Sequence, residues 1–320
     1  MKLGVFTPVV AFMSLKEAME YLSSIGVEAV EIGAGGYPGK AHLDPDKLLG
    51  NKNAIDEVKS IISGNGIELS AISCHGNPVH PQRDIAEDYH DQFIKAMQLA
   101  SELGVDTIVG FSGCPGDSEG SKYPNWVTCP WPEDFLKVLD YQWDVLNNYW
   151  AKTAEIAKGY GIKKIAFEMH PGFCVYNPET LLKLRKNVGD IIGANFDPSH
   201  LIWQGINPVN AIRYLGDAIY HFHAKDTRIE PENSLRNGVL DTKGYGEIFD
   251  RSWVFRTVGY GNDTAFWKDM MSALRTIGYD GIISIEHEDG LMSAKEGLEK
   301  AVEFLKPMII KEKQGEMWWA

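Results

Sequence analysis

Ionisable side chains gather at the ends of several short apolar runs in this sequence. Six of the nine histidines lie in such segments. Histidine and carboxylate are the groups that most often bind metal ions and transfer protons near neutral pH. We therefore expect one catalytic or metal-binding site assembled from several parts of the chain. The segments are IELSAISCHG (67–76), FEMHP (167–171), NFDPSH (195–200), HFHAKD (221–226) and SIEHED (284–289).

Alternation along these runs sorts their side chains onto two faces. Successive side chains of a β-strand point to opposite sides, so apolar residues in the segment 165–170 alternate with Glu168 and His170. The same alternation puts Asp197 and Glu286 on the less apolar faces of their segments. The apolar faces should pack against helices, and the ionisable faces should share one interior space.

Carboxylates that share a buried space are costly unless they are paired or bind a metal ion. Three carboxylates and one imidazole suit one divalent ion, with Mn²⁺ preferred and Mg²⁺, Co²⁺ or Zn²⁺ possible. The alternative is a polar plug without metal, in which the acids share protons or are neutralised by Lys225 or Arg256. The predicted metal ligands are Glu168, Asp197, His223 and Glu286.

Other side chains near these segments are candidates for contact with a substrate. Each has a structural alternative: a histidine can be buried with its hydrogen bonds satisfied, an arginine can brace a loop, and a tryptophan can fill a core. Aromatic rings also stack on the apolar face of sugars. The predicted substrate-binding residues are His200, His75, Arg256 and Trp203, and His170 is predicted to be catalytic.

Two adjacent charged residues end the segment 221–226. We expect Lys225 and Asp226 to pair with each other beneath the site. The alternative is that Asp226 orients a metal ligand from behind.

Strand-like and helix-like patterns alternate along the whole chain, which predicts a parallel sheet. Eight such units predict a (β/α)8 TIM barrel that forms a single domain over residues 1–312, followed by a tail at 313–320. The rival is an open doubly wound sheet, but GAGGYPG (33–39) lacks the glycine spacing of a dinucleotide site. Long loops should follow strand four (114–132) and strand seven (227–262). Both would lie at the carboxyl ends of the strands, where barrels keep their active sites.

Composition excludes several classes of protein. The 320 residues include 31 basic and 44 acidic side chains, and the net charge of −13 disfavours nucleic acid as a partner. No apolar stretch reaches the length of a membrane span, so we expect no membrane partner and a cytoplasmic location. Four widely spaced cysteines do not suggest a disulfide framework.

Four segments of the chain carry a resemblance to a known family: in order, FEMHP (167–171), NFDPSH (195–200), HFHAKD (221–226) and SIEHED (284–289). They resemble the xylose-isomerase-like sugar isomerase/epimerase barrels, which are grouped with the type-2 apurinic endonucleases (AP endonuclease 2 superfamily). The similarity extends over residues 2–311. It implies the same metal quartet, and an acid–base role for Glu168 and Glu286 as in the ketose epimerases. It also implies that His200 contacts substrate. The DNA-repair branch carries basic loops, which the acidic charge here does not match.

Two features depart from plain ketose epimerases. His170 lies two residues after Glu168, on the same face, and the loop 227–262 is long. These features look more like a subgroup of sugar phosphate isomerases/epimerases that also resembles the large subunit of bacterial C-glycoside deglycosidases. Those enzymes cleave 3-oxo-glycosides and pair with a small β-rich subunit. The sequence has no phosphate-binding glycine cluster, which disfavours a phosphorylated substrate.

The shared chemistry implied is proton abstraction beside a metal-bound carbonyl of a keto-sugar, through an enediolate. Return of the proton gives an epimer or an isomer, and the first predicted function is therefore that of a sugar isomerase or epimerase. Loss of an aglycone from a 3-oxo-glycoside would make the protein a lyase, with His170 as a base. A third possibility is a binding subunit that holds a metal ion in the barrel and has no catalytic activity.

The apolar ending MWWA (317–320) suggests docking in a homo-oligomer, or in a hetero-oligomer with a small β-rich subunit. The alternatives are that this end is frayed or folded back onto its own barrel.

Overall fold

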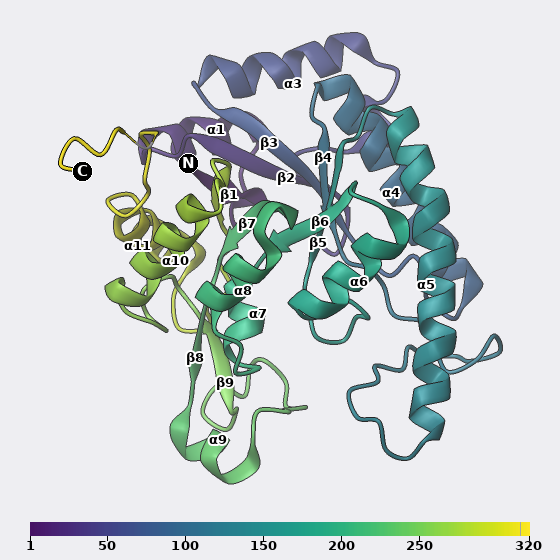
Figure 1. The fold of residues 1–320 in the computed structure, drawn as a ribbon. Helices are drawn as coiled ribbons and strands as arrows, with labels where there is room; N and C mark the ends of the chain where they lie inside the picture. Colours follow the sequence, from purple (N-terminus) through teal and green to yellow (C-terminus); the bar gives the residue numbers. More distant parts are fainter. Residues whose placement is uncertain (314) are drawn as a thin grey trace.

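A closed barrel of eight parallel strands forms the centre of the molecule (Figure 1). The computed structural model describes residues 1–313 and 315–320. The strand order around the barrel is β1-β10-β7-β6-β5-β4-β3-β2. The predicted single-domain (β/α)8 barrel is confirmed, whereas the separation of a tail after residue 312 stays a prediction. The barrel strands are β1 (Lys2–Phe6), β2 (Ala29–Gly36), β3 (Glu68–His75), β4 (Thr107–Gly110), β5 (Lys164–Glu168), β6 (Ile192–Phe196), β7 (Ile219–Ala224) and β10 (Ile282–Ile285).

Helices surround this barrel and bury one apolar face each against it (Figure 1). Their starts are set by local sequence: Ser14 and Glu17 form a reciprocal capping box that begins the first helix. The main helices are α1 (Leu15–Ser24), α3 (Lys52–Gly64), α4 (Arg83–Leu103), α5 (Asp134–Gly159), α6 (Pro178–Val188), α8 (Pro208–Leu215), α10 (Thr264–Thr276) and α11 (Ala294–Leu305). Shorter helices are η1 (Thr7–Val10), α2 (Pro45–Leu48), α7 (Pro198–Ile202) and η2 (Gly216–Ala218).

The predicted alternation separates two compartments. Ile165 and Phe167 belong to the large apolar core between strands and helices. Ala166, which has the inward parity of Glu168, joins a small separate cluster with Ala71 and Val109 inside the barrel. Small side chains low in the barrel leave its upper interior to longer, polar ones.

Two long segments extend from the carboxyl end of the barrel (Figure 1). Residues 114–132, after β4, contain no helix or strand, as predicted. Residues 226–262, here called the arm, contain a hairpin that the sequence analysis did not predict. Its strands β8 (Asp226–Ile229) and β9 (Trp253–Arg256) pair antiparallel, and α9 (Pro231–Asn237) lies between them.

Asp226 fixes the arm to the barrel. Its Oδ2 accepts hydrogen bonds from the backbone N–H of Gly259 and Gly261 and from the indole Nε1 of Trp267, at 3.0, 3.1 and 3.2 Å. The predicted pairing of Lys225 with Asp226 is wrong. Consecutive residues of an extended segment point to opposite sides, so Lys225 faces the cavity described below and Asp226 faces the arm.

Replacement of Asp226 by Ala should destabilise the protein, because several buried donors would lose their acceptor. We expect the free energy of unfolding to fall by about 3 kcal/mol, measured by urea unfolding. Asp269→Ala is the matched control, since Asp269 is exposed on α10 and makes no hydrogen bond or ion pair with the residues described. Equal effects of the two substitutions would contradict this role of Asp226.

The C-terminal tail does not fold back onto the barrel. Trp318 and Trp319 are 88% and 68% exposed, so the folded-back alternative is wrong, whereas docking on another chain stays a prediction. Across residues 1–313 and 315–320, no helix combines the length and apolarity that crossing a membrane would require.

Candidate active site

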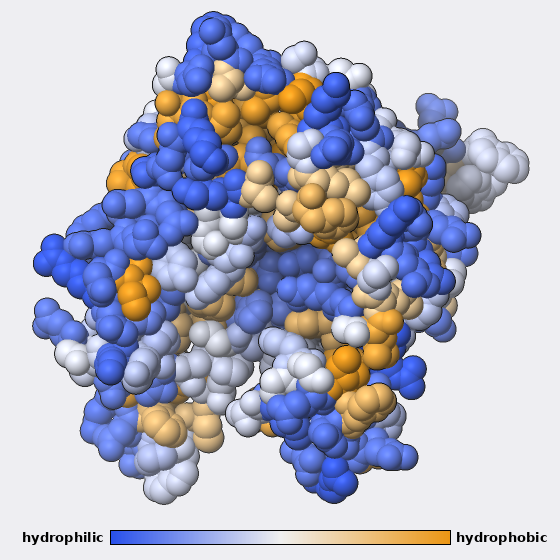
Figure 2. All heavy atoms as spheres, turned by 180° about the vertical axis from the view of Figure 1, so that it is seen from behind, coloured by the Kyte–Doolittle hydropathy of each residue, from blue (hydrophilic) through white to orange (hydrophobic). Residues whose placement is uncertain are grey.

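A cavity of about 770 Å³ opens at the carboxyl ends of the strands. Figure 2 shows this face hollowed, with hydrophilic side chains in the recess and apolar ones around it. Below the recess, two lobes formed by the segment 114–132 and the arm are separated by a cleft. Glu168, Lys225 and Glu286 line the cavity, so part of the predicted site faces an open space.

The four predicted metal ligands meet in this region. One possible ligand atom from each lies within 4.8 Å of the others. Each comes from the end of a different strand: Glu168 ends β5, His223 lies in β7, and Glu286 directly follows β10. Asp197 follows β6 and caps α7, where its Oδ1 accepts a hydrogen bond from the Ser199 N–H at 2.8 Å. The other oxygen of Asp197, Oδ2, therefore points to the three other predicted ligands and could coordinate an ion.

The donor atoms of this cluster suit a divalent cation. Asp197 Oδ2, His223 Nδ1 and Glu286 Oε2 are buried and make no well-aligned hydrogen bond among the residues described, although charged groups lie close to each of them. His223 Nδ1 lies 3.0 Å from Glu286 Oε2 and 3.3 Å from Glu168 Oε2. Buried polar atoms without a hydrogen bond are rare in native proteins. Three carboxylates and one imidazole at such distances could coordinate one divalent ion, which would in turn give these buried atoms a partner.

Glu31 orients His223 from below. Glu31 Oε2 lies 2.7 Å from His223 Nε2, and its carboxylate also accepts hydrogen bonds from the hydroxyls of Ser73 and Ser284. Burial would raise the pKa of Glu31, but the facing imidazoles of His223 and His221 lower it to about 2. A carboxylate that holds the far nitrogen of a ligating histidine fixes the ring and directs its other nitrogen at the ion.

The sequence analysis missed Glu31. The available signal was Glu31 in the middle of the run VEAVEIG (27–33), which also contains Glu28 nearer its start. Its role depends on side chains from three other strands, which no local pattern indicates.

Glu31→Gln should weaken metal binding without removing a ligand. Because the amide cannot accept the Nε2–H bond as a carboxylate does, we expect the Kd for Mn²⁺ to rise about 10- to 100-fold, measured by calorimetry. Glu303→Gln, on the exposed face of α11, is the control. An unchanged Kd in Glu31→Gln would show that His223 is held without this carboxylate.

Lys225 is the buried cation of the cluster. It is 2% exposed, and its Nζ lies 3.1 Å from Asp197 Oδ2, 2.9 Å from Glu286 Oε2 and 3.2 Å from Glu288 Oε2. The lysine of the polar-plug alternative is therefore present. Its single charge cannot balance Glu288 together with the buried carboxylates of the site, which are Glu31, Glu168, Asp197 and Glu286.

Without a bound ion, protons on His223 and Asp197 can offset the remaining negative charge. Burial would lower the pKa of His223, but the carboxylates of Glu31 and Glu286 raise it well above its usual range. Burial raises the pKa of Asp197. Burial also opposes ionisation of Glu286, but the ammonium of Lys225 lowers its pKa to about 2. A divalent ion would replace the proton on His223, because a ligating imidazole nitrogen must be deprotonated.

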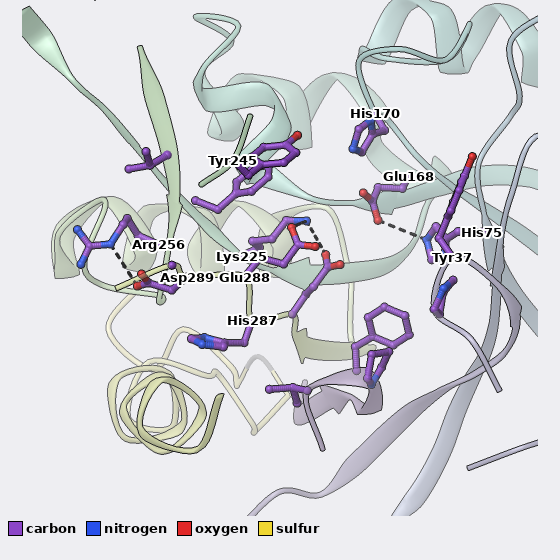
Figure 3. A pocket seen from close by; sticks show the side chains of 18 of the residues that line it. Tyr37, His75, Glu168, His170, Lys225, Tyr245, Arg256, His287, Glu288 and Asp289 are labelled. Carbon is purple, nitrogen blue, oxygen red and sulfur yellow. Dashed lines mark hydrogen bonds and ion pairs between the residues drawn. The ribbon is translucent and has the colours of Figure 1, made fainter. Parts of the chain in front are cut away.

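The three predicted histidines surround Glu168: two lie on its cavity side, and one lies on the side away from the cavity. His75 and His170 line the cavity (Figure 3), and His75 Nε2 lies 3.4 Å from Glu168 Oε2. His170 holds its Nδ1 at 2.6 Å from the Pro171 carbonyl, which leaves Nε2 available. His200 is 1% exposed and does not line the cavity; its Nε2 lies 3.0 Å from Glu168 Oε1. His200 thus braces the carboxylate from behind.

Arg256 and Trp203 lie away from the cluster. Arg256 lines the edge of the cavity, where its Nε donates to Asp289 Oδ2 at 3.1 Å, so it braces the mouth by an ion pair (Figure 3). Trp203 is buried and stacks on Trp253, with ring centroids 4.6 Å apart, so it packs the arm against α7. The aromatic side chains that line the cavity are Phe6, Tyr37, Phe111, Phe173, Tyr245 and Phe255.

The family of the chain follows from comparison with known proteins. The model described as "Xylose isomerase-like TIM barrel" matches residues 19–308. The chain belongs to this family. Among curated proteins, the uncharacterized protein YfiH of Bacillus subtilis is 38% identical over 312 residues, 97% of this chain and 99% of that protein. An inosose dehydratase of Clostridium botulinum is 29% identical over 204 residues, 63% of this chain and 64% of its own.

Solved structures of other proteins share this fold. A D-tagatose 3-epimerase-like protein superposes with a TM-score of 0.63 at 24% identity, covering 96% of this chain and 98% of its own. The IolI protein, solved with a bound zinc atom, superposes with a TM-score of 0.65 at 21% identity, covering 96% of both chains. These likenesses show the fold, and the cluster of Glu168, Asp197, His223 and Glu286 could hold a divalent metal ion.

Proposed function

We propose that the protein is a divalent-metal-dependent sugar isomerase or epimerase that abstracts a proton beside the carbonyl of a keto-sugar. The observation that carries this proposal is the convergence of Asp197 Oδ2, His223 Nδ1 and Glu286 Oε2, which make no well-aligned hydrogen bond among the residues described, beside an open cavity. A divalent ion bound there would supply Lewis acidity for the developing enediolate charge. The epimerase-like and zinc-bound relatives support the reaction class and the metal.

Glu168 and Glu286 would act as the acid and the base. They line the cavity from β5 and from the end of β10, with β6 and β7 between them in the barrel order. A substrate bound between them would present one face to each carboxylate. The pKa of both groups is lowered, so both are ionised near neutral pH and either can accept a proton. The other, once protonated, could return a proton to the opposite face.

Aromatic side chains would hold the sugar ring. Tyr37 and Tyr245 lie on opposite sides of the cavity (Figure 3), so apolar surface is available on both sides. His75 and Arg256 also line it and are proposed to bind substrate, whereas His200 and Trp203 would act indirectly.

Solvent-exchange NMR tests the proposal. In deuterated buffer with Mn²⁺, we expect deuterium beside the carbonyl of at least one free ketose, without loss of any other group. The double variant Glu168→Gln/Glu286→Gln, which lacks both carboxylates, serves as the inactive control. Absence of exchange on every ketose and 3-oxo-glycoside, with Mn²⁺ bound, would overturn the proposal and favour a binding subunit.

Elimination is the second candidate, favoured by the similarity to inosose dehydratase. After the same proton abstraction, loss of a hydroxyl or an aglycone from the β carbon would give a dehydratase or a glycoside lyase. The lyase would pair with a small β-rich subunit. His170 lines the cavity and would be the base. Burial and the neighbouring His200 lower its pKa to about 3, so its ring is neutral near pH 7 and can accept a proton. Glu168 and Glu286 line the cavity from two strands and can serve both faces of a substrate, which supports the glutamate pair first. Release of aglycone or water in the NMR assay would reverse this order.

A further inference from the structure

Lys225 has no role in the acid–base pair proposed above, yet the fold places it at the centre of the site. It directly follows β7, beside Glu286, whose N–H donates to the carbonyl of Ala224 at 3.2 Å. Figure 3 shows its side chain among the carboxylates that line the cavity. Its Nζ also lies 4.8 Å from the ring centroid of Phe255. Such a buried ammonium is costly unless each of its donors has a partner.

The carboxylates around Lys225 are shared with the candidate ion. Asp197 Oδ2 and Glu286 Oε2 lie 3.1 and 2.9 Å from Nζ, and both residues belong to the metal-ligand set. Two cations drawn to the same oxygens repel each other. A site built only to hold a metal ion would bind it more tightly without this lysine. The ammonium therefore needs another explanation, and it also lines the cavity.

We propose that Lys225 is a catalytic residue that balances the acidic cluster in the metal-free protein and, once the ion is bound, hydrogen-bonds the substrate oxygen that becomes negative. This rests on the proposed function. Once an ion draws on Asp197 and Glu286, the N–H groups of Lys225 can turn to an oxygen in the cavity. The ammonium stays protonated throughout, so it supplies hydrogen bonds and charge and transfers no proton. A fixed donor aimed at a developing oxyanion speeds such reactions.

The proposal predicts effects of opposite sign in one variant. Lys225→Met should bind Mn²⁺ at least about 10-fold more tightly, because a competing charge is removed. The same variant should lose at least about 100-fold in kcat for a ketose that the wild type accepts, at saturating Mn²⁺. Calorimetry measures the first effect without any substrate, and exchange kinetics measure the second.

Two further variants control the experiment. Lys225→Gln removes the charge but keeps a polar side chain, so it should show the same signs if Lys225→Met folds poorly. Lys59→Met, on the exposed face of α3, should change neither quantity. Circular dichroism verifies that each variant is folded.

Each outcome decides the proposal. Weaker or unchanged Mn²⁺ binding in both neutral variants would make Lys225 a structural residue and overturn it. Tighter binding with unchanged kcat would overturn the catalytic assignment and leave the proposed function standing. If the wild type exchanges no proton of any sugar, the proposed function fails, and the catalytic assignment fails with it.

Discussion

Glu168→Gln should lower kcat on an accepted ketose by about 10³-fold. Glu168 is 2% exposed and lies within 3.4 Å of ring nitrogens of His200, His223 and His75. The amide keeps the size of the side chain but cannot accept a proton from carbon. Its NH₂ group would also face imidazole nitrogens that now face carboxylate oxygens.

Loss of the base must be separated from loss of the metal. We would therefore measure kcat at saturating Mn²⁺ and the Kd for Mn²⁺ in the same preparation. Glu179→Gln, on an exposed position of α6, is the control. A variant that retains more than about a tenth of wild-type kcat with metal bound would exclude Glu168 from proton transfer.

The two glutamates can also be told apart. If each serves one face of the substrate, Glu168→Gln and Glu286→Gln should both stop interconversion of the epimers. Each variant should still exchange the proton of the one epimer that faces its remaining carboxylate. Exchange of the same epimer by both variants would contradict a two-base mechanism.

Local patterns were sufficient to predict the barrel and the convergence of Glu168, Asp197, His223 and Glu286 at its mouth. Each barrel strand is a short apolar run with its own helix, and each predicted ligand lies at the end of such a run. In a barrel all these ends meet at one mouth, so chain order and alternation predict which side chains converge. Glu168 and Glu286 lie far apart in sequence, and only the closed fold brings them to one cavity.

Contacts between distant segments were not predictable in this way. The arm pairs β8 with β9 through strands of only four residues each, separated by a helix and a loop. Strand preference depends on such neighbours more than on the residues themselves. Glu31 was missed for the same reason, because its partners Ser73, His223 and Ser284 come from β3, β7 and β10.

The error at Lys225 and Asp226 has a different cause. Adjacent opposite charges suggested a pair, but the chain is extended there, so alternation separates the two side chains. Asp226 accepts hydrogen bonds from the arm, and Lys225 contacts the acidic cluster. The alternation of side chains that predicts the metal ligands also predicts that Lys225 and Asp226 point to opposite sides.

Removal of the metal should abolish activity. Dialysis against a chelator would leave Glu168, Asp197 and Glu286 with only Lys225 and protons for balance, and nothing would stabilise the enediolate charge. We expect less than about 1% of the activity to remain, and Mn²⁺ to restore it. Restored activity with neither Mn²⁺, Mg²⁺, Co²⁺ nor Zn²⁺ present would contradict a metal-dependent reaction.

Metal binding should also change the free energy of unfolding and the number of protons bound to the protein. Mn²⁺ at 100 times its Kd would raise the free energy of unfolding by about 2.7 kcal/mol, measured by thermal unfolding. Because the pKa of His223 is raised in the metal-free protein, binding should release a proton, and the affinity should fall as the pH is lowered. Calorimetry in buffers of different ionisation enthalpy measures that proton. His223→Asn is the matched variant, and it should lose both the stabilisation and the proton release; a full response in this variant would place the metal elsewhere.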